Sequence, residues 1–181
     1  MKKFILRFLD RLRSVPPLPI LKRAPDAVMS RPRLIHNPER IRIGKRCRIG
    51  EYSYFSPIVE YSGEKFEPYI VIGDDVYIGR FSCITSCQSV IIGNNVVLSE
   101  HVYISDNEHS KDRRDVPIMK QPLRSKGPVR IGDWCFVGYG AKILGGVELG
   151  EGCVIGAGAV VTKSFPAGSR IGGVPARLLK E

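Results

Sequence analysis

The sequence of 181 residues lacks any uninterrupted apolar run of roughly 18 residues, the length that a helix needs to cross a bilayer. We therefore expect no membrane-spanning helix. Residues 1–10 also lack the long apolar segment and the small-residue cleavage site of a secretory signal peptide. These absences favour a cytoplasmic protein, which could still lie peripherally on the inner face of the membrane.

Cysteine spacings typical of metal sites and disulfide frameworks are missing too. The chain has five cysteines, an odd number, and no two of them have CxxC spacing. Cys47, Cys135 and Cys153 share one position of the six-residue repeat described below, where a small buried residue is expected. Reduced cysteines that act as small core residues fit this pattern better than a metal site or disulfides do. We therefore expect no bound metal, and reduced thiols agree with a cytoplasmic location.

Acidic residues are in the minority, with 18 Asp and Glu against 28 Lys and Arg, which gives a formal net charge of +10. A basic chain can bind nucleic acid, an anionic membrane surface or a phosphorylated small molecule. Beyond the N-terminal residues, however, the sequence has no basic helical segment interleaved with aromatic residues. The pattern therefore predicts no nucleic-acid partner.

Residues 1–14 have the pattern of a short amphipathic helix. Apolar residues fall on one face at helical spacing, namely Phe4, Ile5, Phe8, Leu9 and Leu12. Basic residues form the polar side, namely Lys2, Lys3, Arg7, Arg11 and Arg13. The helix could pack on its own body or on a neighbouring subunit, or it could rest on an anionic membrane surface, or the segment could be disordered. Several prolines then predict an extended connector over residues 15–38.

A six-residue repeat dominates the rest of the chain and is uninterrupted from Ile131 to Pro166. An aliphatic residue opens each of these hexads, namely Ile131, Val137, Ile143, Leu149, Ile155 and Val161. Glycine follows in four of them, at Gly132, Gly138, Gly150 and Gly156. Six residues is not a helical period, and strict alternation is absent. The unit instead suits a short strand followed by a corner, where glycine allows the backbone to turn.

The hexads begin at Ile43 and are interrupted by residues 60–69 and again by residues 106–128. The second interruption is long enough to indicate a loop that is either functional or disordered. With three hexads to a coil, the repeat predicts about five coils that bury their first positions inside. The expected division is an N-terminal helix and proline-rich connector (residues 1–40), a coil domain (residues 41–170) and a tail (residues 171–181). Within the tail, residues 176–180 could form a short helix.

The repeat and three further strings resemble the hexapeptide-repeat acyltransferases. The strings are Gly127–Phe136 (GPVRIGDWCF), Ile155–Lys163 (IGAGAVVTK) and Gly172–Leu178 (GGVPARL). The resemblance covers roughly residues 41–181 and is greatest to sugar O-acetyltransferases, both the maltose and galactoside enzymes and those that modify surface polysaccharides. It implies an all-β fold, a left-handed parallel β-helix with a long protruding loop. It also implies acetyl-CoA as the acyl donor and a homotrimer with active sites between subunits.

Acyl transfer to a hydroxyl needs a base that accepts the proton of the attacking alcohol. The chain has only three histidines, His36, His101 and His109, and His109 lies where the repeat gives way to the long loop. The resemblance implies that His109 is this general base, a role that suits histidine because its usual pKa lies near neutral pH. Its orienting partner stays open between a backbone carbonyl and three acidic residues, Asp106, Glu108 and Glu100. Asp106 could instead hydrogen-bond the acceptor sugar.

The resemblance also implies which residues bind CoA. Backbone amides of Tyr139 and Ala157 match positions that hold the pantetheine arm, although Tyr139 replaces the usual Ala or Ser and could narrow the channel. Residues that match basic positions for the CoA phosphates, or the family's Thr-Lys pair, are Thr162, Lys163, Arg177 and Lys180. The family's tryptophan before Ile-Gly is Phe136 here, so no role is transferred to it.

The acceptor side departs from the family pattern. The Asn and Asp that touch the sugar in relatives match Gly79 or Arg80, and Cys87, so a simple galactoside or maltose acceptor is not expected. Candidates to replace them are Tyr77, Arg80, Ser82 and Ser86. The loop is basic, with Arg113, Arg114, Lys120, Arg124 and Lys126. This charge could favour an anionic or nucleotide-linked acceptor, or could belong to a solvated loop that closes over a neighbouring subunit.

We therefore predict an acetyl-CoA-dependent O-acetyltransferase that acts on a saccharide hydroxyl in the biosynthesis of O-antigen, capsule or exopolysaccharide. Alternatives on the same fold are N-acetylation of an amino sugar or nucleotide sugar, and O-acetylation of an antibiotic such as chloramphenicol or a streptogramin. A carbonic-anhydrase-like zinc enzyme would need three histidine ligands, but only His101 and His109 lie within the repeats. A non-catalytic binding solenoid is the remaining alternative, since fold alone does not imply activity.

Overall fold

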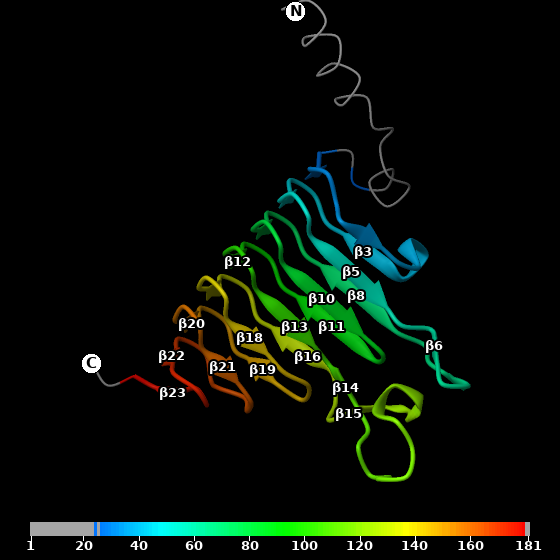
Figure 1. Ribbon diagram of the computed structural model, residues 1–181. Helices are drawn as coiled ribbons and strands as arrows, with labels where there is room; N and C mark the ends of the chain where they lie inside the picture. Colours follow the sequence, from blue (N-terminus) through cyan, green and yellow to red (C-terminus); the bar gives the residue numbers. More distant parts are fainter. Residues whose placement is uncertain (1–23, 25, 180–181) are drawn as a thin grey trace, which may run out of the picture.

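The computed structural model describes residue 24 and residues 26–179 (Figure 1). The amphipathic helix predicted for residues 1–14 and the predicted CoA-binding residue Lys180 lie outside this part of the chain. Both therefore stay predictions. In the part that is described, no helix is long and apolar enough to cross a membrane.

The described chain winds into stacked coils whose short strands form three sheets, named A, B and C (Figure 1). Sheet A contains β1 (Val28–Met29), β4 (Arg48–Ile49), β9 (Tyr77–Ile78), β12 (Val97–Leu98), β17 (Phe136–Val137), β20 (Val154–Ile155), β22 (Arg170–Gly172) and β23 (Arg177–Leu178). Sheet B contains β2 (Leu34–Ile35), β5 (Tyr54–Pro57), β10 (Cys83–Ser86), β13 (Tyr103–Ser105), β18 (Lys142–Ile143) and β21 (Val160–Val161). Sheet C contains β3 (Ile41–Ile43), β8 (Tyr69–Ile72), β11 (Ser89–Ile92), β16 (Val129–Ile131) and β19 (Glu148–Leu149). All pairings in these sheets except that of β22 with β23 are parallel.

The hexad openers line the inside of this β-helix. In sheet A, Ile49 pairs in register with Ile78, and Ile78 pairs with Leu98. All three side chains are buried. Each coil therefore covers the apolar interior of the next one, so the fold is stabilised by stacking between coils. The predicted hexad pattern and the all-β class are confirmed.

The cysteines at the fifth hexad position are free, buried thiols within this core. Each donates a hydrogen bond to a carbonyl of the following coil: Cys47 to Gly73 at 3.1 Å, Cys135 to Gly150 at 3.2 Å, and Cys153 to Pro166 at 3.2 Å. Burial raises the pKa of the Cys135 thiol to about 11. These cysteines therefore act as small core residues, as the sequence predicts.

The coils begin before residue 41, within the segment expected to be a connector. β1 pairs with β4 and β2 pairs with β5, both in parallel, so residues 27–38 add a coil to those counted from Ile43. Pro32 lies at a corner and Pro38 at the first position of the 3-10 helix η2 (Pro38–Arg40), where no ladder N–H is needed. The prolines therefore do not prevent strand pairing, and the boundary drawn at residue 41 is too late.

The C-terminal tail contains a strand instead of the short helix expected over residues 176–180. The chain turns at residues 173–176, and β23 then pairs antiparallel with β22. The Leu179 N–H donates to the Arg170 carbonyl at 2.8 Å. Backbone hydrogen bonds to β22 therefore outweigh the helix propensity of Arg177, Leu178 and Leu179.

Two segments leave the coils on the same side of the molecule, at the lower right of Figure 1. The first, named the excursion, spans residues 60–69 and contains the antiparallel hairpin of β6 (Glu60–Tyr61) and β7 (Glu64–Lys65). As predicted, the excursion breaks the period and runs outside the coils.

The second segment is the long loop of residues 106–128, named the protruding loop. It leaves the coils directly after β13 and starts with the hairpin of β14 (Asn107–His109) and β15 (Leu123–Ser125). Between these strands it carries the 3-10 helix η3 (Ile118–Lys120). The sequence predicts this loop, but not the hairpin at its base.

Candidate active site

His109 lies in β14, at the base of the protruding loop, opposite Leu123 of β15. Its half-buried ring meets the ring of Tyr61 edge-on, with 5.2 Å between the centroids and 64° between the planes. The Tyr61 hydroxyl donates a hydrogen bond to the carbonyl of Met119 at 2.9 Å. The excursion therefore contacts both the base of the protruding loop, at His109, and η3, which precedes β15.

One atom of the His109 ring has an unusual environment. Among the described residues, Nδ1 of His109 is the single buried side-chain nitrogen or oxygen without a hydrogen-bond partner. Such an atom costs about 1–3 kcal/mol unless something satisfies it. Unpaired buried polar atoms in native structures call for an explanation, and a catalytic role is one.

The other two histidines are both engaged by their neighbours. His36 Nδ1 lies 3.1 Å from the Ser56 hydroxyl. His101 stacks on Phe81 with 4.9 Å between centroids and 17° between planes, and its other neighbour Tyr139 lies at 5.2 Å. His109 differs from both in its place at the base of the protruding loop and in its buried, unpaired Nδ1, so it is the best placed of the three for catalysis.

Asp106, the first residue of the protruding loop, is fully buried. Its carboxylate accepts hydrogen bonds from the Ser86 hydroxyl at 2.7 Å and from the backbone N–H groups of Cys87 at 2.7 Å and Gln88 at 2.8 Å. The amide of Asn107 adds a fourth at 3.1 Å. Asp106 therefore anchors the start of the loop to the turn that follows β10, and it makes no hydrogen bond to His109.

The neighbouring coil comes very close to this anchor. A Cβ atom placed on Gly145 would lie 2.9 Å from the carbonyl oxygen of Asp106. Glycine is therefore needed there, because a larger residue would push Asp106 away from its hydrogen-bond donors.

The acidic candidates do not reach His109. Glu108 precedes His109 in β14, so the two side chains point to opposite faces of the strand. The Glu108 carboxylate lies 4.0 Å from the Lys126 ammonium across the hairpin. Glu100 precedes β13, and Arg80 precedes β10, whereas the loop departs from the opposite end of these strands. At 3.3 Å per residue, Arg80 and Ser86 lie roughly 20 Å apart along the chain. Within one chain, therefore, neither Glu100 nor Arg80 is brought to the loop.

The two residues whose amides match the pantetheine site lie at one corner of the β-helix. Tyr139 follows β17 and Ala157 follows β20, so they occupy equivalent positions in successive coils. The Gly158 N–H donates to the Tyr139 carbonyl at 2.8 Å, but the N–H groups of Tyr139 and Ala157 have no acceptor among the described residues. Two unpaired, exposed donors in line fit an extended ligand that carries amide carbonyls.

The basic CoA candidates lie elsewhere. Thr162 and Lys163 follow β21 at the other edge of sheet B, and the Lys163 ammonium lies 5.4 Å from the centroid of the Phe165 ring. Extending the strand register by two residues places Lys163 next to Gly145 in the adjacent coil. The same extension places Gly145 next to Asp106 in the coil beyond. Arg177 is exposed in β23. The predicted CoA residues are thus divided between the two edges of sheet B.

Of the acceptor candidates, Ser82 and Ser86 are buried, while Tyr77 is exposed on sheet A; Cys87, which departs from the family pattern, is buried too. Burial, and next the negative charge of Asp106, raise the pKa of the Cys87 thiol to about 12.

No group of His, Cys, Asp and Glu in the described part of the chain is arranged to hold a metal ion. The sequence analysis missed Tyr61, and only its place in a non-repeating excursion could have drawn attention to it.

Comparison with known proteins identifies the same repeats that the structure shows. A family model described as the hexapeptide repeat of succinyl-transferase matches residues 69–105 and 128–163. The repeats of this chain are therefore similar to those of the hexapeptide-repeat acyltransferases. These two matches flank the protruding loop, so the loop is an insertion between repeats.

Two relatives of this chain are named for acetyl transfer. One is a Mycobacterium tuberculosis protein named as an acetyltransferase, 37% identical over 108 residues, which are 60% of this chain and 36% of that protein. The other is WbbJ of Escherichia coli, named for O-acetyl transfer in lipopolysaccharide biosynthesis, 31% identical over 119 residues. That match covers 62% of this chain and 60% of WbbJ. The chain thus spans less than two thirds of the length of either relative.

Among solved structures, galactoside acetyltransferase in complex with coenzyme A superposes with a TM-score of 0.59 at 27% identity. The superposition covers 77% of this chain and 64% of the other. It confirms the predicted fold, a left-handed parallel β-helix.

Proposed function

We propose that this protein is an acetyl-CoA-dependent O-acetyltransferase that acts on a saccharide hydroxyl, with His109 as the general base. The observation that carries the proposal is the contrast between the three histidines. Two are held by neighbours, whereas His109, at the base of the protruding loop, keeps a buried nitrogen unpaired. The names of WbbJ and of the mycobacterial relative support the reaction class.

His109 can act through Nε2, because Nδ1 is buried and out of reach of a substrate. Nε2 accepts the proton as the acceptor oxygen attacks the thioester carbonyl, and the tetrahedral intermediate then expels the CoA thiolate. In this tautomer Nδ1 carries a proton and needs an acceptor. That acceptor would come from a second subunit.

Acetyl-CoA fits the corner formed by Tyr139 and Ala157. The unpaired N–H groups of these residues can donate to the carbonyls of the pantetheine arm, as strands do in a sheet. Lys163 and Arg177, with Thr162 and Lys180, would serve the CoA phosphates. Coenzyme A bound to galactoside acetyltransferase supports this donor.

A homotrimer would complete the site. In one chain, the corner of Tyr139 and the base of the loop lie at opposite edges of sheet B. A neighbouring copy could place its corner against this His109, so that donor and acceptor meet between subunits. This arrangement predicts that the active species is an oligomer and that the monomer is inactive.

The relative WbbJ supports an acceptor in surface-polysaccharide assembly, where cytoplasmic acetyl-CoA is available. Residues 1–14 would then place the enzyme on the inner face of the membrane. A chain that lacks these residues should bind anionic liposomes less than the full chain does. Equal binding would refute the membrane role.

The reaction is tested by release of free thiol from acetyl-CoA in the presence of candidate acceptors. The screen includes neutral sugars, amino sugars, nucleotide sugars and lipid-linked glycans, with the product bond identified by its stability to mild base, since esters cleave and amides do not. Ester formation is expected. Amide formation would replace O-acetylation by N-acetylation, and the absence of thiol release with every acceptor would refute the proposal.

A further inference from the structure

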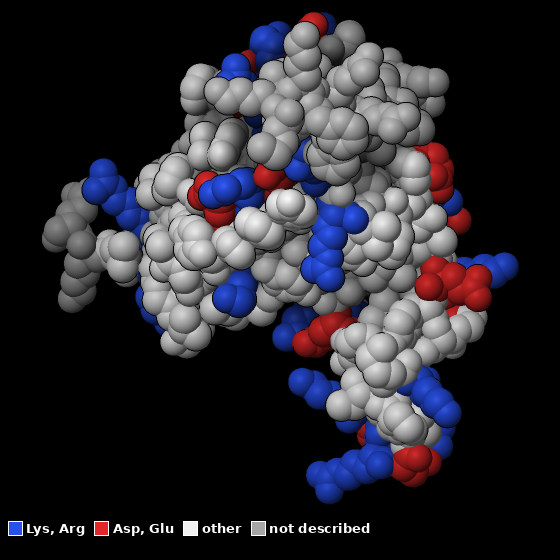
Figure 2. Space-filling model, turned by 45° about the horizontal axis from the view of Figure 1, so that its top comes forward, with Lys and Arg blue, Asp and Glu red and all other residues white. Residues whose placement is uncertain are grey.

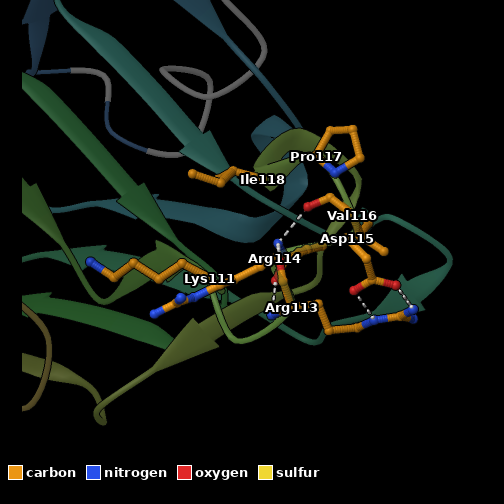
Figure 3. A pocket seen from close by; sticks show the side chains of 8 residues that line it. Lys111, Arg113, Arg114, Asp115, Val116, Pro117 and Ile118 are labelled. Carbon is orange, nitrogen blue, oxygen red and sulfur yellow. Dashed lines mark hydrogen bonds and ion pairs between the residues drawn. The ribbon is translucent and has the colours of Figure 1, made fainter.

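The protruding loop contains a cavity of its own. It has a volume of about 510 Å³ and is lined by residues 111–118 together with Gln121, except Asp112 (Figure 3). Figure 2 shows Lys and Arg side chains gathered on this loop, at the lower right of the view. The cavity therefore lies in the most basic part of the segment that also carries His109.

The wall of the cavity is held by one buried amide. The side chain of Gln121 donates to the carbonyls of Arg113 at 2.7 Å and Val116 at 2.8 Å, and accepts from the Arg113 N–H at 3.2 Å. Only 3% of Gln121 is exposed. Residues 113–116 thus wrap around a fully bonded amide, which gives this part of the loop a defined shape.

Most charges of the loop cancel one another. Asp115 pairs with Arg113, which lowers the pKa of its carboxyl group. Asp112 pairs with Arg124. Glu108 lies near Lys126, and Asp106 is bonded to backbone donors. The basic side chains that remain without an ion pair among the described residues are those of Lys111, Arg114 and Lys120.

Two of these three unpaired cations line the cavity, and they point the same way. In Figure 3, Lys111 and Arg114 extend to one side, whereas Arg113 turns the other way to meet Asp115. Lysine and arginine together recognise phosphate, lysine as a point charge and arginine through its fork of donors. Val116, Pro117 and Ile118 add an apolar wall beside them.

The cavity is also close to the proposed base. Lys111 follows His109 by two residues, so their Cα atoms are at most about 7 Å apart. A phosphate bound by Lys111 can therefore belong to the same molecule as a hydroxyl that faces His109.

We propose that this cavity binds a phosphate or pyrophosphate group that is attached to the acceptor saccharide. The inference rests on the proposed function, since it names the acceptor of that same site. Two sources share this chemistry, a nucleotide-linked sugar and a lipid-linked sugar. Lys111 and Arg114 bind the phosphate, and Lys120, which does not line the cavity, takes no part.

Binding is measured first, by calorimetry of the full chain with inorganic pyrophosphate and without acetyl-CoA. Lys111→Ala and Arg114→Ala are expected to weaken binding roughly tenfold each, the loss of one charge-assisted hydrogen bond. Lys120→Ala removes an equal charge from the same loop and should leave binding unchanged. An equal loss in all three variants would mean diffuse attraction to a basic surface and would overturn the site, as would no binding at all.

Transfer is then measured with a nucleotide sugar, with the same sugar free, and with vesicles that carry a pyrophosphate-linked lipid sugar. KM for the preferred linked acceptor should rise about tenfold in Lys111→Ala and Arg114→Ala, because a phosphate contact is lost. The acceptor that is used most efficiently, nucleotide-linked or lipid-linked, identifies the source of the phosphate group. Transfer to the free sugar that is equally efficient and unaffected by both variants would overturn this inference while leaving the acetyltransferase proposal intact. Pyrophosphate binding without any thiol release would instead refute the acetyltransferase proposal.

Discussion

The ring of Tyr61 stands edge-on against the ring of His109, with 5.2 Å between their centroids. The two residues come from segments that both interrupt the repeat, and they are 48 positions apart in sequence. Tyr61 also donates a hydrogen bond to the carbonyl of Met119 in η3 of the protruding loop. One side chain therefore connects the excursion to both β14 and η3 of the loop.

Tyr61→Ala should lower kcat roughly tenfold, since an aromatic pair contributes about 0.5–1.5 kcal/mol to the position of the ring. KM for acetyl-CoA should stay the same. Tyr61→Phe keeps the ring and should keep most of the activity. Tyr54→Ala removes the same kind of edge-on contact from the ring of His36 and serves as the control. Steady-state kinetics with unchanged kcat in Tyr61→Ala would show that the contact does not position His109.

His109→Ala should reduce kcat about 10²–10⁴-fold, which is the usual contribution of a general base. His101→Ala removes a ring that also contacts Tyr139 at the proposed CoA corner, so it should change KM for acetyl-CoA and leave kcat largely unchanged. Thiol release from acetyl-CoA measures both variants under saturating acceptor. If the two substitutions have equal effects, the assignment of His109 as the base is wrong.

Asp106→Ala should lower the free energy of unfolding by about 2–4 kcal/mol, because buried donors at Cys87 and Gln88 lose their acceptor. Activity should fall further than stability alone explains, since the loop leaves the coil at this residue. Urea unfolding gives the first quantity. Asp115→Asn, an exposed carboxylate of the same loop, should unfold like the unchanged protein.

Lys163→Ala should raise KM for acetyl-CoA about tenfold while kcat changes little, as expected when a contact to a phosphate is lost equally in ground and transition states. Lys45→Ala is the matched control. It removes one positive charge from an exposed corner, far from the edge of sheet B where the protruding loop leaves the coils. Initial rates at varied acetyl-CoA distinguish the two. A lower kcat with unchanged KM would exclude the phosphate role of Lys163.

Alkaline pH should destabilise the fold through its buried thiols. Their pKa values are raised from 9.0 to about 11 for Cys135 and about 12 for Cys87, chiefly by burial. The folded protein keeps these protons where the unfolded chain loses them. The stabilisation is therefore complete below pH 9 and is lost as pH rises toward 11 and 12. Urea unfolding at pH 8 and pH 10.5 should show the fall, and Cys135→Ala should show a smaller one.

The period of six predicts the coils well because each hexad opener is forced inward by the strand and corner that follow it. Ile131 and Val137 are buried as expected. The first coil is harder to recognise, since no glycine follows Leu34 or Ile35 and prolines surround them. The tail is misread because the pairing of β23 depends on β22, which local helix propensity cannot register.

The candidate site is only partly accessible to sequence reasoning. The position of His109 at the start of a loop is local information, and the pattern identifies it. The partners of Asp106 are not local, because they lie 18–20 residues away, in the preceding coil. Tyr61 has no periodic position at all, so nothing in the sequence relates it to His109.

The reversal of β23 has a consequence for how the protein behaves at high concentration. A column of parallel strands can grow without end, since the last strand of one molecule presents the same backbone groups that the first strand of another can pair with. β23 runs antiparallel along β22 and occupies those groups in sheet A. A second molecule can then no longer add head to tail in the register of the coils, and growth of this sheet into fibres is blocked at its C-terminal end.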